Sequence, residues 1–275
     1  MDTSEQVDEK RKRAIVIVSI GDRPWLPSVA EIASHYADRC NADLILETEA
    51  PSQDEFVLPE LPDSPGRPHK RLYACKSYYA WKHLAVSGYR KVLVLDDTCC
   101  INAHTPDIFK KIGPGQVGYT ITGASDAQRS FDDIHRFQEA MGEPPVPADQ
   151  DLYMNSGVLV YDHRMVDALA PHRIVAASEL LMSRFPHQSL TYYLLRRAEV
   201  SMRKLEKKFN VVPAVNLDKE VRRDMTDMLP HLSRDTYIYH ITGMYRQRAQ
   251  IIEQICEHLR PKWRDATTSE EGRQG

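Results

Sequence analysis

The chain has 275 residues, of which 42% are hydrophobic and 27% charged, a composition that excludes disordered and fibrous classes and allows a sizeable buried core. Its 36 Lys and Arg residues against 39 Asp and Glu residues give a formal charge of -3, which offers no positive excess for binding nucleic acid. No apolar run approaches the roughly 18 residues that span a membrane, and the charged N-terminus lacks a signal-peptide core, so we expect a soluble, cytoplasmic protein.

The first part of the chain is expected to alternate between strands and helices. Residues 14–19 form an apolar, β-branched run that ends at a Gly-Asp-Arg-Pro turn, which predicts a strand buried on both faces. Apolar residues at helical spacing from Val29 to Cys40 and a short strand over 43–46 complete a strand–helix–strand unit, which is typical of a parallel sheet. Next come a proline-rich loop or lid over 50–68 and a helix over 71–86.

The rest of the chain continues this alternation without internal repeats. The expected elements are a buried strand over 91–101, a short helix opened by Thr105 as cap and Pro106, a strand over 117–122, a helix over 131–141, a loop over 144–151, a strand over 152–162 interrupted by a small polar turn, helices over 174–184 and 188–199, a strand from Val200, a strand over 236–243 and an amphipathic helix over 246–259. We predict one α/β domain over 14–263 with a mostly parallel central sheet flanked by helices, a charged leader over 1–13 and a polar, disordered tail over 264–275.

The five cysteines do not indicate disulfides or a zinc site. Their number is odd, no Cys-x-x-Cys pair occurs, and they lie within apolar segments. Cys99 and Cys100 are neighbours on an expected strand, so their side chains should point to opposite faces. We expect all five to be reduced and buried.

An acidic motif follows the apolar part of the strand that begins at residue 91. Ligands of open parallel sheets bind beyond the carboxyl ends of the strands. Asp96 and Asp97, followed by Thr98, stand at such an end, and adjacent carboxylates there need a cationic partner. A divalent cation such as Mg²⁺ or Mn²⁺ prefers these oxygen ligands. The alternative is that both carboxylates lie in a solvated turn.

Two further strand ends carry polar residues. Asn155, Ser156 and the following glycine are small and hydrogen-bonding, which allows close approach of the backbone to a ligand or, alternatively, forms a tight turn or bulge. His240 ends a late strand and is either a metal ligand or a core histidine with its hydrogen bonds satisfied. Arg246 follows it and is suited to a bidentate phosphate contact, or else is a solvated residue of the next helix.

The order and spacing of these motifs resemble one known family. The matching segments are AIVIVSIGDRPWLP, RLYACKSYYAWKHL, KVLVLDDT, YMNSGVLVYD, FPHQSLTYYLL and IYHITGMYR. Together they resemble the glycogenin-like, family-eight nucleotide-sugar glycosyltransferases with the Rossmann-like GT-A fold, over residues 14–259. The resemblance implies metal-assisted transfer of a sugar from a nucleotide-diphosphate donor, such as a UDP-sugar, to an acceptor hydroxyl with retention of configuration. The acceptor class (glycan, protein or small molecule) is left open.

The resemblance also assigns a metal site. It implies Mn²⁺, or Mg²⁺, held by Asp96 and His240 and bridging to the donor diphosphate. Thr98 stands where the family has a second Asp, so a neutral hydroxyl replaces one anionic ligand. Asp97 is an alternative second carboxylate if the turn twists.

Donor-binding residues are implied in the same way. His240, Gly243 and Arg246 correspond to the family's His-x-x-Gly-x-x-Lys, which gives Arg246 the diphosphate-binding role of the lysine. Gln188 matches the glutamine of an Asp-Gln pair near the anomeric carbon, and His187 replaces the Asp. The remaining implied contacts are Asn155 and Ser156 with the donor sugar and ribose, and Ser19, Gly21 and Arg23 with the nucleotide base. Lys76 either contacts the base or phosphate or is an exposed helical lysine.

Two other functions remain as alternatives. Thr98 and His187 depart from the family pattern, as they would in a non-catalytic, GT-A-like domain that only binds nucleotide sugars. Asp96-Asp97-Thr98 is also loosely similar to the Asp-x-Asp-x-Thr of haloacid-dehalogenase-type phosphatases. In that family, however, the nucleophile follows the first strand.

Overall fold

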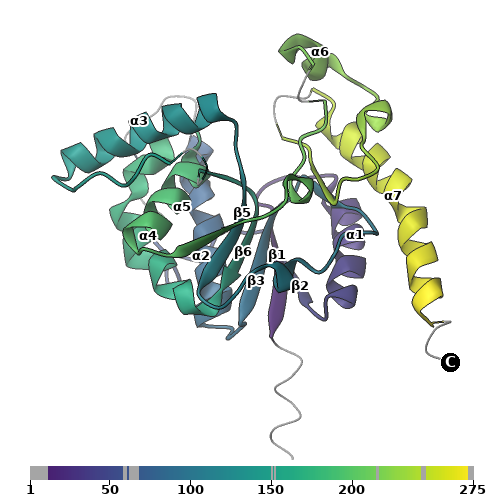
Figure 1. Ribbon diagram of the computed structural model, residues 1–275, viewed down its shortest axis with the longest axis horizontal. Helices are drawn as coiled ribbons and strands as arrows, with labels where there is room; N and C mark the ends of the chain where they lie inside the picture. Colours follow the sequence, from purple (N-terminus) through teal and green to yellow (C-terminus); the bar gives the residue numbers. More distant parts are fainter. Residues whose placement is uncertain are drawn as a thin grey trace, which may run out of the picture.

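The computed structural model describes residues 12–57, 61, 68–149, 151, 153–214, 217–242 and 246–271. Within them, a six-stranded sheet in the order β2-β1-β3-β6-β5-β7 forms the centre of the molecule (Figure 1). Its strands are β1 (Arg13–Val18), β2 (Asp43–Glu47), β3 (Lys91–Asp96), β5 (Gln116–Ile121), β6 (Met154–Asp162) and β7 (Ser201–Lys204). β1 pairs in parallel with β2 and β3, β5 pairs in parallel with β7, and β6 runs antiparallel to β3 and β5, so the predicted mostly parallel sheet is confirmed.

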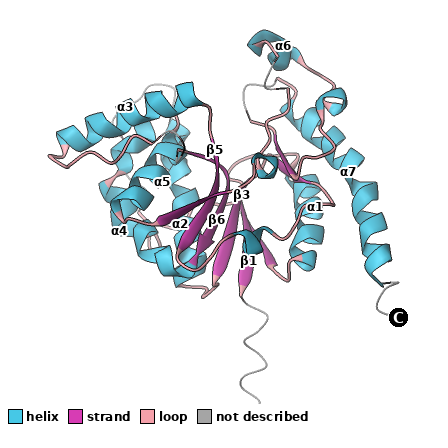
Figure 2. Cartoon of the chain, in the orientation of Figure 1, coloured by secondary structure: helices cyan, strands magenta, loops and turns pink. Residues whose placement is uncertain are grey.

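Helices cover both faces of this sheet, as Figure 2 shows. One face packs against α2 (Ala74–Ala85), α3 (Ala124–Ala140), α4 (Pro171–Ala176) and α5 (Pro186–Arg197). The other face packs against α1 (Leu26–Arg39), and α7 (Arg248–Glu271) packs in turn on α1. Alternate residues of β1 point into the two hydrophobic cores, Val16 into the core on the first face and Ile17 into the core on the second. This confirms that the strand is buried on both sides.

A second sheet carries the histidine motif. The predicted single strand over 91–101 is wrong, because the chain bends at Asp97 and Thr98 and the following residues leave the main sheet. They form β4 (Cys99–Ile101), which pairs antiparallel with β8 (Ile238–His240). Cys99 lies opposite His240 in this pairing, and a late segment of the chain is thereby fixed next to the end of β3.

Three other elements differ from expectation. β6 is continuous and has no turn; instead its pairing with β5 shifts register, with Tyr119 opposite Leu159 but Thr120 opposite Asn155. The helix expected over 174–184 is divided into α4 and a 3₁₀ turn over residues 178–182. The 3₁₀ turn over 108–111 is capped by Asp107, because the Thr105 hydroxyl donates to the Asn102 and Tyr237 carbonyls.

The C-terminal helix is longer than predicted. α7 continues to Glu271, whereas we expected a disordered tail from residue 264. Trp263 anchors this part of the helix, because its ring is buried and its Nε1 donates to the Ile101 carbonyl at 3.0 Å. Most of the expected leader, and residues 58–60 and 62–67 of the expected proline-rich loop, lie outside the described residues.

The cysteines behave as predicted, since all five are free thiols and buried. Cys99 and Cys100 have different partners: the Cys99 thiol approaches the Gly157 carbonyl, and Cys100 Sγ lies 3.8 Å from Cys256 Sγ. Among the residues that the structure describes, no helix combines the length and the apolar character that a membrane crossing requires.

Candidate functional site

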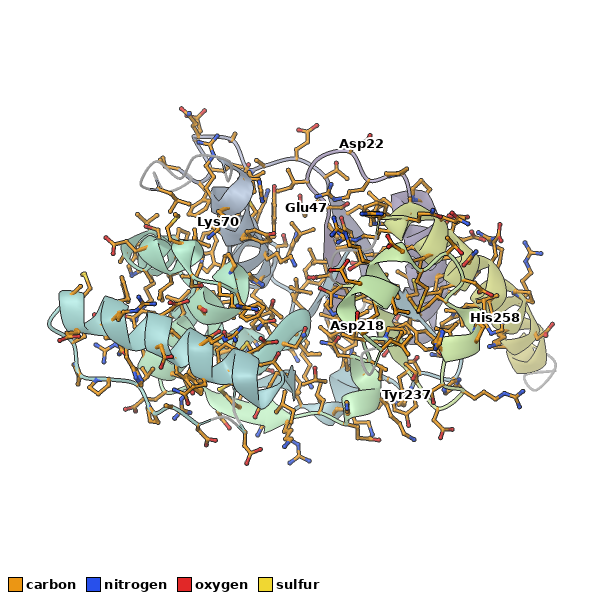
Figure 3. All side chains as sticks on the ribbon, turned by 90° about the horizontal axis from the view of Figure 1, so that it is seen from above. Asp22, Glu47, Lys70, Asp218, Tyr237 and His258 are labelled. Carbon is orange, nitrogen blue, oxygen red and sulfur yellow. The ribbon has the colours of Figure 1, made fainter. Side chains whose placement is uncertain are left out.

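A cavity of about 1860 Å³ opens at the carboxyl ends of β1 and β3. In Figure 1, α3 and α5 stand on one side of this end of the sheet and α6 (Lys219–Asp224) and α7 on the other. Figure 3 looks onto this end of the molecule. The cavity brings together residues from all three predicted strand-end motifs, among them Asp96, Asn155 and His240.

Asp96 is held between two basic groups. Its Oδ1 forms an ion pair with the Lys76 ammonium, and its Oδ2 lies 3.3 Å from His240 Nε2. Burial by itself raises the pKa of Asp96, but the charge and hydrogen bond of Lys76, together with the nearby His240, outweigh it and hold that pKa well below its ordinary value. Asp96 is therefore a carboxylate throughout the physiological range.

A chain of hydrogen bonds fixes the orientation of the His240 ring. The Gly157 backbone N–H donates to Asn155 Oδ1 at 2.9 Å, so this oxygen is an acceptor. The same oxygen accepts from Asn210 Nδ2 at 3.0 Å, which turns Asn210 Oδ1 toward His240 Nδ1 at 2.9 Å. Nδ1 must then carry a proton, and in the neutral ring Nε2 presents a lone pair toward Asp96.

The result is a pair of facing acceptors. His240 Nε2 is buried and makes no hydrogen bond within the described residues, although it lies near Asp96. A neutral imidazole nitrogen and a carboxylate oxygen at this distance repel each other unless a proton or a cation lies between them. The arrangement therefore fits a cation held by these two atoms.

Gly157 makes room for the histidine. A Cβ atom built on Gly157 would lie 2.2 Å from His240 Cε1, closer than any real contact. We expected this small-residue motif to allow close approach of a ligand to the backbone. In the structure, the group that approaches Gly157 closely is the His240 ring.

Asp97 faces a different set of partners. Its Oδ2 accepts from the Ser19 hydroxyl at 2.9 Å and from Arg23 Nε at 3.0 Å. Burial and the neighbouring Asp96 raise the pKa of Asp97, although these hydrogen bonds oppose the shift. The structure thus places Asp97 with two of the predicted base-binding residues and not with His240.

The metal-binding potential is that of a two-residue site. Thr98 is buried beside Asp96 and supplies at most a neutral oxygen. Among the residues that the structure describes, no group of three His, Cys, Asp or Glu side chains could hold a metal ion. Asp96 and His240 are the two converging ligands, and a bound ion would need further oxygens from a ligand or water.

The start of α5 brings two more predicted residues to the cavity. His187 is only 3% exposed, and neither of its ring nitrogens has a hydrogen-bond partner within the described residues. Burial, together with the Lys76 charge, lowers the pKa of His187 to about 3 despite the opposing charge of Asp96, so the ring is neutral at physiological pH. Gln188 Oε1 accepts from the Ser156 N–H at 3.4 Å, while its Nε2 makes no hydrogen bond.

Other predicted residues are placed differently. Gly21 adopts φ +95° in the turn after β1, a conformation that favours glycine. Gly243 lies outside the described residues. Arg246 forms an ion pair with Asp224 at 2.8 Å, and its side chain is 62% exposed. It does not line the cavity, although the sequence resemblance gives it a diphosphate-binding role.

Asn210 is the site residue that the sequence did not reveal. It follows a 3₁₀ turn over 207–209 and connects Asn155 to His240. A single asparagine in a loop carries no motif signal, and its role depends on the pairing of β4 with β8. Only the folded chain shows it.

Comparisons with solved structures found glycosyltransferases that are similar to this chain in fold. A glycosyltransferase involved in the glycosylation of the major capsid of PBCV-1 matches with a TM-score of 0.53 and 14% identity, over 88% of this chain and 98% of that chain. The galactosyltransferase LgtC, solved with donor and acceptor sugar analogues, gives a TM-score of 0.49 and 15% identity over 92% of this chain and 99% of its own. Mouse xyloside xylosyltransferase 1 gives a TM-score of 0.48 and 11% identity over 83% of this chain and 97% of its own.

The first of these likenesses shows the fold. The chain has the α/β architecture of GT-A glycosyltransferases, as the sequence predicted. No family model matches the sequence, and no curated protein matches it either.

Proposed function

We propose that the protein transfers a sugar from a nucleotide-diphosphate donor, a UDP-sugar, to an acceptor hydroxyl, with metal assistance and retention of configuration. The observation that carries this proposal is the convergence of Asp96 Oδ2 and His240 Nε2, 3.3 Å apart, in the cavity at the carboxyl ends of the strands. In open α/β sheets this is where nucleotides bind. The GT-A architecture makes the same end of the sheet the expected donor site.

Asp96 and His240 are the residues that would hold Mn²⁺ or Mg²⁺. A bound ion supplies Lewis-acid neutralisation of the charge that develops on the departing diphosphate. Because the chain offers two ligand atoms and Lys76 competes for Asp96, we expect little metal affinity without nucleotide. Oxygens of the nucleotide would supply the missing ligands, so metal and nucleotide should bind together.

Lys76 and Arg23 supply fixed positive charge around the donor. Lys76 is paired with Asp96, and its ammonium is positioned to stabilise a diphosphate when that carboxylate is shared with a metal. Arg23 and Ser19 hold Asp97 and form the wall beside β1, where we place the nucleoside. Asp97 then acts as a hydrogen-bond acceptor in the nucleoside part of the site.

His187 and Gln188 are suited to face the transferred sugar. A neutral imidazole offers one donor and one acceptor, and the Gln188 amide offers further donors. Buried polar atoms without partners are costly, so their presence in a cavity wall favours a ligand with hydroxyl groups. Asn155 supports this region indirectly, since its amide oxygen is used by Gly157 and Asn210.

The non-catalytic alternative keeps one specific observation in its favour. Thr98 and His187 remove two carboxylates from the family pattern, and a domain that has lost turnover would still bind the nucleotide sugar. The phosphatase alternative has less support, because Asp96 ends β3 and not the first strand.

A screen of nucleotide sugars for Mn²⁺-dependent donor hydrolysis tests the proposal. We expect at least one UDP-sugar to be hydrolysed by the wild type, and the activity to disappear in EDTA and in Asp96→Asn. Calorimetry with UDP and Mn²⁺ accompanies the screen. Binding without hydrolysis or transfer would favour the non-catalytic domain, and no binding of UDP would contradict both GT-A functions.

A further inference from the structure

The cavity is larger than one substrate requires. Its volume of about 1860 Å³ is nearly twice the upper end of the roughly 300–1,000 Å³ that holds one drug-sized ligand. If the donor occupies the region around Asp96, as proposed above, room for a second ligand remains. The side chains around that second region define its chemistry.

Cations concentrate on the C-terminal side of the cavity. We call this set of lining residues the basic wall; it consists of Lys207, Arg222, Arg223 and Arg248. They come from the 3₁₀ turn after β7, from α6 and from the start of α7. Glu220, which also lines the cavity, lies 3.8 Å from Arg223 and is 72% exposed, so it offsets little of this charge. A chain with a formal charge of -3 thus presents a local positive surface here.

Arg222 is the residue that indicates a ligand. Its Nε is sealed from solvent and has no hydrogen-bond partner, and its guanidinium forms no ion pair with any described residue. A partly desolvated guanidinium without an anion is unfavourable. Lys207 is also without an ion pair in the described part of the chain, but it is exposed and therefore hydrated.

The basic wall is separate from the charges at the strand ends. The cations that act on Asp96 and Asp97 are Lys76 and Arg23, and each of them is already paired with a carboxylate. The charges at the strand ends therefore neutralise one another. In the wall, Lys207 and Arg222 have no ion pair within the described residues, so their positive charge is not used by the donor site.

We infer that the basic wall binds an anionic group, a phosphate or a carboxylate, on the acceptor. The inference rests on the proposed glycosyl transfer, which requires a second substrate in the same cavity. Planar guanidinium groups pair with both anions through two parallel hydrogen bonds, and Arg222 lines the cavity. The acceptor is therefore a phosphorylated or acidic carbohydrate and not a neutral one.

Calorimetry on the full chain saturated with UDP and Mn²⁺ tests this inference. The probes are methyl glucoside, glucose 6-phosphate and glucuronate, which share a ring and differ in charge. We expect at least one charged sugar to bind 10-fold or more tightly than methyl glucoside, and the stronger of the two identifies phosphate or carboxylate as the anion. Arg222→Gln should remove this preference, and Arg222→Lys should retain part of it. Arg234→Gln should retain all of it, because Arg234 is exposed and follows the cavity-lining Ser233 without lining the cavity itself.

Each other outcome has a distinct meaning. Equal or absent binding of the charged sugars by a wild type that binds UDP overturns the inference alone. A loss of UDP affinity above 3-fold in Arg222→Gln also overturns it, because the basic wall would then belong to the donor site. Failure of the wild type to bind UDP overturns the proposed function and the inference with it.

Discussion

His240 Nε2 lies 3.3 Å from Asp96 Oδ2, although the two residues belong to different sheets. The contact is possible because β4 follows β3 after a two-residue bend and pairs with β8, which sets Cys99 opposite His240. The short second sheet therefore acts as the support of the candidate metal site. Changes that shift β8 or the His240 ring should affect the site without touching a substrate.

Gly157→Ala tests this support. The added methyl would lie 2.2 Å from the His240 ring, so the ring must move away from Asp96. We expect Mn²⁺-dependent UDP affinity to fall at least about 10-fold, with a stability loss of about 1–3 kcal/mol from overpacking. Calorimetry and urea unfolding measure the two effects. Gly123→Ala is the matched control, because a Cβ there meets no atom within 4 Å; equal UDP binding by both variants would show that His240 has no part in the site.

Thr98→Asp should create the third metal ligand that the chain lacks. A second carboxylate beside Asp96 strengthens attraction for a divalent cation, while it destabilises the metal-free protein through like-charge repulsion at a buried position. We expect nucleotide-free Mn²⁺ affinity to rise at least about 10-fold. The melting temperature should be below that of the wild type in EDTA and recover on addition of Mn²⁺. A variant that melts at the same temperature with and without Mn²⁺ would contradict the placement of Thr98 at the ion.

Asp97→Asn separates the nucleoside side of the site from the metal side. Asp97 contacts Ser19 and Arg23, so the variant should bind UDP more weakly, by about 3- to 10-fold for one altered charge-assisted contact. The Mn²⁺ concentration at the midpoint of the titration should remain within about 3-fold of the wild-type value. Mn²⁺ titrations at saturating UDP provide the measurement. A large shift in the Mn²⁺ midpoint would instead favour the alternative in which Asp97 is a metal ligand.

His187 should make the fold sensitive to acid. Its pKa is lowered to about 3 in the folded protein from an ordinary 6.5, so the unfolded chain binds the additional proton as pH falls. The stabilisation of the fold by neutral His187 is fully present above pH 6.5. As the pH falls toward 3 it is lost, and the free energy of unfolding decreases by about 1.4 kcal/mol per pH unit. Between pH 7 and pH 5 the free energy of unfolding, measured in urea, should therefore decrease by about 2 kcal/mol more in the wild type than in His187→Leu. Equal losses would show that the buried ring is not held neutral.

The sequence predicted much of the main sheet and the two carboxylates, because β-branched apolar runs and helical spacing report local burial directly. It did not predict the break between β3 and β4, since apolar residues 92–95 and 99–101 flank the motif Asp96-Asp97-Thr98 on both sides. It also gave Gly157 a ligand-binding role, whereas the close neighbour is the His240 ring. Such contacts depend on strand pairing between distant segments, which periodicity does not encode.

The most direct test of the account is a Mn²⁺ titration followed by electron paramagnetic resonance, with and without UDP. We predict weak binding of Mn²⁺ to the protein alone, binding of one ion when UDP is present, and loss of that ion in both Asp96→Asn and His240→Ala. If these two variants bind Mn²⁺ with UDP as the wild type does, Asp96 and His240 do not meet at a metal, and the proposed donor site is wrong.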